Sequence, residues 1–387
     1  MKRRAEVVVI GAGAIGLGVA YELARRGVTD VVVVDRQHLN FGATARNGGG
    51  VRAQWTTKAN IELARESIRR FDVLSQELGH NLFWRQGGYL FVARTDTQVE
   101  ALERAVRFQN ANGVGTRLID PDEARSIVPA LDVDGCGIKA GSYNPRDATL
   151  FPWPLVWGYH EQCTRMGVEV QPFTTVTDIV THPETREVKA VVTDKGRIDC
   201  SWVVNATGSW TNDIGRMVGI ELPIRPERHE ILVTEPLKPF LRCMLVDMTT
   251  GLYASQSSRG EIVGGVAEQR TAITMDWAST LPFLTHMART LTFLVPRMRH
   301  VPVLRQWAGS YDMTPDAKPI VEAHEEVPGY VTVAGFSGHG IMISPVSCEV
   351  VADLVMGRTP RFDVATMSSR RFTPGGPDVE EETLVIG

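Results

Sequence analysis

The sequence lacks paired cysteines, long apolar runs and blocks of a single charge. Its five cysteines are scattered and never form a Cys-x-x-Cys pair. This excludes a disulfide framework and a zinc or iron–sulfur site, so we expect reduced thiols, no metal and a cytoplasmic location. Beyond the first 35 residues, no stretch reaches the roughly 18 to 20 apolar residues that a membrane span requires, so we expect no membrane span.

The charges are balanced and dispersed. Lys and Arg number 41 against 45 for Asp and Glu, which gives a net charge of −4. A nucleic-acid groove needs a clustered basic surface, so nucleic acid is excluded as a partner. The 387 residues, 43% of them hydrophobic, are enough for two or three domains with sizeable cores.

The N-terminus has two readings. The basic residues 2–4 and the mostly apolar residues 7–20 are also typical of an export signal. However, four glycines interrupt the apolar run, and an acidic residue, Asp35, ends a second one at residues 31–34. These features favour a nucleotide-binding turn.

The glycines form a Gly-x-Gly-x-x-Gly motif between a β-branched strand and a helix. Gly11 permits the tight turn, Gly13 lets the backbone approach a pyrophosphate, and Gly16 allows close packing of helix on strand. Asp35 follows at the reach of a ribose diol and disfavours a 2′-phosphate. The motif predicts a bound dinucleotide but does not separate NAD from FAD.

Two further glycine-containing loops and a small-residue turn favour FAD. Residues 41–52 and 331–342 are rich in glycine, and residues 202–210 form a strand that ends in small residues. A helix that begins near residue 340 would place its positive end at a flavin ring and stabilise the reduced anion. NAD enzymes need one such loop, whereas FAD, which is longer and carries a large ring, needs several.

Five motifs together resemble the D-amino-acid oxidase-like flavoprotein superfamily. Within it, the chain is most similar to the β subunits of sarcosine oxidase and their relatives, which include glycine oxidase, proline dehydrogenase and other amino-acid dehydrogenases. The resemblance covers residues 7–372. The motifs are GAGAIG, ATARNGGGVRAQW, VVNATGSW, SYDMTPDAKPIV and GFSGHGIMISP.

The resemblance implies an α/β plus α+β fold with two discontinuous domains. The Rossmann-like FAD-binding domain would comprise residues 1–82, 143–219 and 323–373. The substrate domain, built on a mixed or antiparallel sheet, would comprise residues 83–142 and 220–322. Residues 374–387 are expected to be a C-terminal tail, either mobile or docked.

The motifs and the resemblance together assign the residues that would hold noncovalent FAD. They are Gly11, Gly13, Ala14, Ile15, Gly16, Asp35, Arg36, Ala43, Thr44, Arg46, Asn47, Gly48, Gly49, Val51, Val176, Ala206, Gly208, Trp210, Gly338, Gly340, Ile341 and Met342.

Four residues are candidates for the substrate side. Arg52 corresponds to an arginine that binds the substrate carboxylate in the family, since a guanidinium grips a carboxylate with two hydrogen bonds. A surface or FAD-phosphate role is its alternative. His229 would begin the strand that faces the pocket, and Tyr253 and Tyr311 would wall it. The two tyrosines could equally be core residues, and the alternative for His229 is a packing or surface residue.

Departures from the relatives refine the expected chemistry. Gly309 replaces a cysteine that tethers FAD, and Met342 replaces a lysine that holds substrate in monomeric sarcosine oxidases. Ile262 falls near the lysine that activates oxygen, which favours a dehydrogenase over an oxidase. Pro152 replaces the histidine that tethers FMN. Covalent FMN is therefore not expected, and noncovalent FMN at a subunit contact is the remaining alternative.

The expected function is FAD-dependent oxidation of the C–N bond of a small amino acid or secondary amine, such as sarcosine, proline or an opine. The alternatives are a flavin-carrying β subunit that is inactive without its partners, and a flavin-dependent 2-hydroxy acid oxidoreductase. Partner subunits or a homo-oligomer are both open, as is the electron acceptor.

Overall fold

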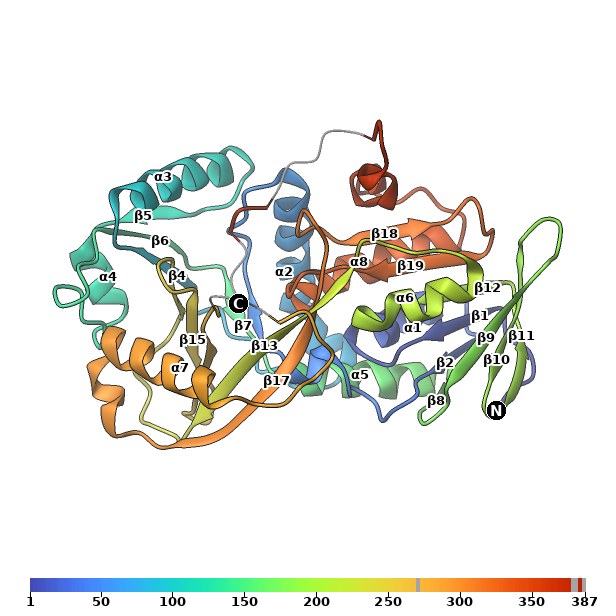
Figure 1. Ribbon diagram of the computed structural model, residues 1–387, viewed down its shortest axis with the longest axis horizontal. Helices are drawn as coiled ribbons and strands as arrows, with labels where there is room; N and C mark the ends of the chain where they lie inside the picture. Colours follow the sequence, from blue (N-terminus) through green and yellow to red (C-terminus); the bar gives the residue numbers. More distant parts are fainter. Residues whose placement is uncertain (269–271, 377–381, 385–387) are drawn as a thin grey trace.

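The computed structural model describes residues 1–268, 272–376 and 382–384, which form two domains side by side (Figure 1). The chain crosses between the domains several times, so each is assembled from separate segments. Neither is a continuous piece of sequence.

The domain that is expected to bind FAD, called the FAD domain below, is built on a six-stranded sheet with the order β18-β19-β12-β1-β2-β8. Its neighbours are parallel except at one edge, where β18 and β19 are antiparallel. The strands are β1 (Val7–Ile10), β2 (Val31–Val34), β8 (Glu169–Gln171), β12 (Trp202–Asn205), β18 (Ile320–Ala323) and β19 (Tyr330–Ala334).

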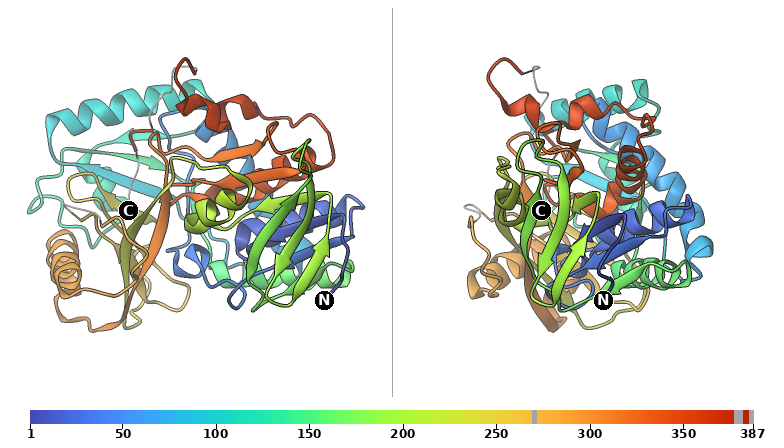
Figure 2. Two further views of the ribbon diagram at one scale, coloured as in Figure 1. Left: turned by 45° about the vertical axis from the view of Figure 1, so that its right-hand side comes forward. Right: turned by 90° about the vertical axis from the view of Figure 1, so that its right-hand side faces the viewer.

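Both faces of this sheet are covered, because its strands are apolar on both sides. Val7 and Val9 of β1 belong to one core together with four helices, whereas Val8 and Ile10 belong to a second core together with a small antiparallel sheet. The turned view in Figure 2 shows this small sheet in front of the domain. The helices are α1 (Ala14–Arg25), α2 (Lys58–Leu78), α5 (Pro152–Arg165) and α8 (Gly340–Val355), and the small sheet comprises β9 (Val176–Thr181), β10 (Val188–Thr193) and β11 (Gly196–Asp199).

The substrate domain is built on an eight-stranded mixed sheet with the order β17-β13-β16-β15-β14-β4-β6-β5. Only β4 and β14 pair in parallel. Helices α4 and α7 contribute to the core on one face, and α3 packs on the other. The elements are β4 (Tyr89–Ala93), β5 (Arg117–Ile119), β6 (Ala140–Asn144), β13 (Arg225–Thr234), β14 (Met244–Asp247), β15 (Leu252–Gln256), β16 (Ile262–Gly265), β17 (Val303–Met313), α3 (Asp96–Ala111), α4 (Pro121–Ile127) and α7 (Leu281–Leu294).

The sheets refine the predicted domain borders slightly. Strand β6 stays in the substrate sheet to Asn144, beyond the predicted border at 142, and β18 joins the FAD sheet from Ile320, before the predicted border at 323. A separate two-stranded antiparallel ribbon pairs β3 (Gly50–Val51) with β7 (Ala148–Thr149). None of the helices in the described segments is long and apolar enough to cross a membrane.

The described part of the C-terminal tail docks at the start of α2. The Glu382 carboxylate accepts hydrogen bonds from the backbone N–H groups of Thr56, at 2.9 and 3.1 Å, and of Thr57, at 3.2 Å. Thr57 is the N-cap residue, but its own side chain makes no capping bond. A carboxylate from the far end of the chain therefore supplies the acceptor that a helix N-terminus needs.

Candidate active site

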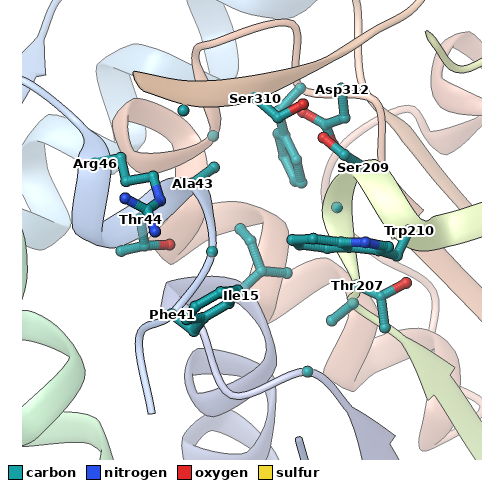
Figure 3. A pocket seen from close by; sticks show the side chains of 18 of the residues that line it. Ile15, Phe41, Ala43, Thr44, Arg46, Thr207, Ser209, Trp210, Ser310 and Asp312 are labelled. Atoms are coloured by element: carbon teal, nitrogen blue, oxygen red, sulfur yellow. The ribbon is translucent and has the colours of Figure 1, made fainter. Parts of the chain in front are cut away.

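An open cavity of about 1710 Å³ lies between the two domains and includes some open solvent. The FAD domain contributes the start of α1, the loop after β2 and the turns after β12 and β19. The substrate domain contributes β13, β15, β17 and the loop before α7. In Figure 3, Arg46 and Thr44 lie on one side and Trp210 and Thr207 on the other, with Ile15 and Phe41 between them.

The glycine-rich turn after β1 leaves no room for side chains. Gly11 has a φ of +110°, and a Cβ there would come within 2.5 Å of the Ala206 carbonyl oxygen. A Cβ on Gly16 would come within 1.8 Å of the Gly11 carbonyl oxygen. Helix α1 begins after Gly13, and Gly13, Ala14 and Ile15 line the cavity, so the positive end of the helix lies beside it, as a pyrophosphate site requires.

Asp35 fixes the end of β2 beside this turn. Its carboxylate accepts hydrogen bonds from the backbone N–H groups of Ala12 and Gln37, each at 2.8 Å. Burial raises the pKa of Asp35, although these two hydrogen bonds oppose the shift. Next to it, the Arg36 guanidinium lies 4.4 Å from the Trp210 ring centroid. Asp35 and Arg36 both line the cavity.

Two buried donors lack partners at the middle of the cavity. Among the described residues, Arg46 Nε and Trp277 Nε1 have no hydrogen-bond acceptor. Such orphaned donors cost free energy unless a ligand supplies acceptors. Together with the glycine-rich turn at the start of α1, these donors fit a long ligand that carries phosphate groups, such as FAD.

The loop after β19 is held by the substrate domain. Asp312 on β17 accepts a hydrogen bond of 2.7 Å from the backbone N–H of Gly335. Gly338 has a φ of +85°, and a Cβ there would lie 2.2 Å from the Tyr311 ring. Helix α8 begins at Gly340 directly after this loop, so its positive end also faces the cavity.

Three predicted substrate residues meet at the substrate-domain wall. The rings of His229 and Tyr311 stack, with centroids 3.9 Å apart and planes inclined by 20°. Tyr311 and Tyr253 share a side-chain hydrogen bond, and burial raises the pKa of Tyr311 to about 12. A Cβ on Gly48 would lie 3.2 Å from the Tyr253 ring, so this wall directly faces the glycine loop of the FAD domain.

Most of the predicted cofactor residues line the cavity. These are Gly11, Gly13, Ala14, Ile15, Asp35, Arg36, Ala43, Thr44, Arg46, Asn47, Gly48, Val176, Ala206, Gly208, Trp210, Gly338, Gly340 and Ile341. Gly16, Gly49, Val51 and Met342 do not line it. Gly16 and Gly49 instead allow backbones to pass closely, since a Cβ on Gly49 would lie 2.0 Å from the Leu150 carbonyl oxygen.

Arg52 also lies outside the cavity lining, contrary to the simplest expectation. Its side chain is 2% exposed, and its guanidinium lies 3.7 Å from the Trp55 ring centroid. It donates hydrogen bonds to the carbonyl oxygens of Gln54 and Leu384. The sequence could not show this, because the contact comes from the C-terminal tail.

Several lining residues were not predicted. Phe41, Trp277, Ser310 and Asp312 all face the cavity. Ser310 and Asp312 lie inside a quoted motif and Phe41 in the glycine-rich segment 41–52, so their positions close to assigned residues could have indicated them. Trp277 lies in a loop with no motif, and no local signal identifies it.

Comparisons with known proteins agree with this site. The family model described as FAD dependent oxidoreductase (DAO) matches residues 6–354. The sarcosine oxidase subunit beta of Rhodobacter capsulatus is 28% identical over 97% of this chain and 90% of its own length. The mitochondrial dimethylglycine dehydrogenase of Rattus norvegicus is 25% identical, and the match covers 96% of this chain but only 45% of that protein.

Solved structures show the same fold. The L-proline dehydrogenase of P. horikoshii superposes with a TM-score of 0.92 and 34% identity, over 98% of this chain and all of the other. The glycine oxidase of Geobacillus kaustophilus superposes with a TM-score of 0.89 at 24% identity, which supports the fold alone. The chain therefore belongs to the DAO family of FAD-dependent oxidoreductases and is an amino-acid or amine oxidoreductase with FAD as its cofactor.

Proposed function

We propose that the protein oxidises the C–N bond of a small amino acid or secondary amine, such as proline, sarcosine or an opine. The carbon beside the nitrogen loses a hydride, the nitrogen lone pair forms the C=N bond of an imine, and water then hydrolyses the imine. Bound FAD supplies the hydride acceptor. The protein supplies orientation and exclusion of water.

The observation that carries this proposal is the wall formed by His229, Tyr253 and Tyr311 opposite the glycine loop at Gly48. Aromatic rings with polar tips suit a small ligand that has both an apolar body and charged groups. The 34% identity with an L-proline dehydrogenase supports an amino-acid substrate.

Two features favour a dehydrogenase over an oxidase. Ile262, near the expected position of an oxygen-activating lysine, is a buried strand residue with 1% exposure. No described residue of the cavity lining is a lysine. We therefore propose an acceptor other than oxygen.

Arg52 remains our candidate for the substrate carboxylate. Its guanidinium is buried, and burial lowers its pKa, although the nearby carboxylates of Glu382 and Asp147 act in the opposite direction. Burial of this cation is costly, so direct contact with an anionic substrate group would stabilise it. Binding would require Arg52 to exchange the Leu384 carbonyl oxygen for the carboxylate.

Anaerobic mixing of the FAD-loaded protein with candidate substrates tests the proposal. We expect proline, sarcosine or a related secondary amine to bleach the flavin absorbance, and an added dye to reoxidise it faster than oxygen does. Bleaching by 2-hydroxy acids alone would instead support the hydroxy acid alternative.

A second candidate is a flavin-carrying subunit that needs partners. It is supported by the similarity to a sarcosine oxidase subunit beta over 90% of that subunit's length. In that case the isolated chain would bind FAD, no amine would bleach it, and activity would return only with partner subunits. Noncovalent FMN at a subunit contact stays a prediction.

A further inference from the structure

Trp277 brings the substrate domain into contact with the residues that hold FAD. It lies in the 272–280 loop, between β16 and α7, and lines the cavity. Its ring centroid lies 5.4 Å from those of both Phe41 and Trp210. The Arg46 guanidinium lies 4.2 Å from the Trp277 ring centroid, within cation–π range.

The start of the 272–280 loop is fixed along β13. The backbone N–H of Arg228 donates to the Ala272 carbonyl oxygen at 2.9 Å, and that of Thr274 donates to the Pro226 carbonyl oxygen at 3.0 Å. Trp277 therefore follows a segment that is hydrogen-bonded to the substrate sheet.

The end of the loop is fixed by a buried carboxylate. Glu230, 3% exposed, accepts hydrogen bonds from Thr280 Oγ1 at 2.6 Å and from the Thr280 backbone N–H at 2.8 Å. Gln306 Nε2 donates to the same carboxylate at 2.8 Å. Because both ends are held, the loop presents Trp277 to the cavity as part of the substrate sheet.

The chemistry at Trp277 calls for an acceptor. Trp277 Nε1 and Arg46 Nε are buried donors without acceptors in the described chain, and their side chains contact each other. Burial and the neighbouring cation Arg305 lower the pKa of Arg46. The Arg46 carbonyl oxygen accepts a hydrogen bond of 3.2 Å from Trp307 Nε1. Thr44, two residues before Arg46, lies 3.3 Å from the backbone nitrogen of Ala14 at the start of α1.

We propose that Trp277 is a cofactor-binding residue, which packs over bound FAD and donates its Nε1–H to the pyrophosphate beside Arg46. The substrate domain would then retain FAD directly, in addition to the Rossmann-like domain. This inference concerns retention of the cofactor and does not depend on which substrate is oxidised.

The test measures FAD binding by Trp277→Ala and Trp277→Phe, with the apo-protein titrated with FAD and followed by flavin fluorescence. We expect Trp277→Ala to raise the Kd for FAD about tenfold or more, since it removes a ring contact and a hydrogen bond to a charged group. Trp277→Phe keeps a ring but loses the donor, so its Kd should lie between those of Trp277→Ala and wild type. The control, Trp157→Ala, changes a tryptophan on α5 that is 47% exposed and outside the cavity lining, and should leave the Kd unchanged.

A second readout does not depend on affinity. FAD should quench less tryptophan emission in Trp277→Phe than in wild type, because a flavin quenches an indole that it contacts. Unchanged or tighter FAD binding by both variants, with unchanged quenching, would overturn the proposal. If Trp277→Ala fails to fold, the Trp277→Phe comparison decides. Failure of wild type to bind FAD would instead count against the cofactor itself.

Discussion

The Arg52 guanidinium donates a hydrogen bond to the carbonyl oxygen of Leu384, which joins the glycine loop of the FAD domain to the C-terminal tail. Leu384 itself is 8% exposed. The tail thus occupies one donor of the arginine that we propose for the substrate carboxylate. Substrate and tail would compete for the same group.

Replacing Arg52 tests its proposed role. Arg52→Met should raise the KM for an amino-acid substrate about tenfold to a hundredfold, because it removes charged hydrogen bonds to the carboxylate. Steady-state assays with a dye acceptor measure this, and an amine without a carboxylate should show no change. Partial recovery of KM in Arg52→Lys would support a charge effect, whereas equal losses with both substrates would contradict it.

Removing the Glu382 carboxylate should destabilise the start of α2. Glu382→Ala leaves the N–H groups of Thr56 and Thr57 without their acceptor, which should lower the free energy of unfolding by about 1 to 2 kcal/mol. Chemical denaturation measures this. The exposed Glu184→Ala serves as the control and should have little effect. Identical stabilities of the two variants would show that the tail contact is not maintained in solution.

Gly11 in the cofactor turn and Gly27 after α1 both have a positive φ. Comparing alanine variants of the two distinguishes the cost of backbone strain from the cost of steric crowding. The φ angles are similar, +110° at Gly11 and +97° at Gly27. Gly11→Ala places a Cβ 2.5 Å from the Ala206 carbonyl oxygen, whereas the Cβ of Gly27→Ala has no other atom within 4 Å. Gly27→Ala should cost only about 1 to 2 kcal/mol of stability. Gly11→Ala should in addition abolish FAD retention, measured as the flavin-to-protein absorbance ratio. Retention of FAD by Gly11→Ala would exclude a close cofactor contact at this turn.

Asp147 should make stability depend on pH. It is fully buried and accepts hydrogen bonds from Ala53 N and Gln54 Nε2, yet burial raises its pKa from 3.8 to about 7. Since the folded state binds the proton more tightly, this group stabilises the protein below about pH 4 and loses that contribution as pH rises towards 7.

The variant Asp147→Asn removes this titration. We expect the variant to become more stable relative to wild type as the pH rises from 4.5 to 7.5. The melting temperatures of both proteins are measured at each pH, and their difference is compared between the two pH values. Any constant effect of the substitution cancels in this comparison. A difference that does not change with pH would show that Asp147 does not titrate in this range.

Local patterns predicted the elements that depend on neighbouring residues. The strand and helix expected on either side of the glycine motif are β1 and α1, and the helix expected near residue 340 begins at Gly340. The Gly11 turn was recognised because its spacing reflects a steric requirement of the turn itself.

Contacts between distant segments could not be predicted. Trp277 reaches the cavity because Glu230 anchors its loop, and Arg52 lies outside the cavity lining with a hydrogen bond to Leu384. No sequence pattern around these residues indicates either contact. The direction of each side chain depends on tertiary packing between segments that are distant in the sequence.

The strand order of the FAD sheet has a consequence for biosynthesis. Strand β12 lies between β1 and β19, so the centre of the sheet is complete only after residues 330–334 have left the ribosome. Until then, the nascent chain carries an unfinished apolar edge that is prone to aggregation. We expect stable FAD binding only once β19 has joined the sheet, because the loop after β19 lines the cavity.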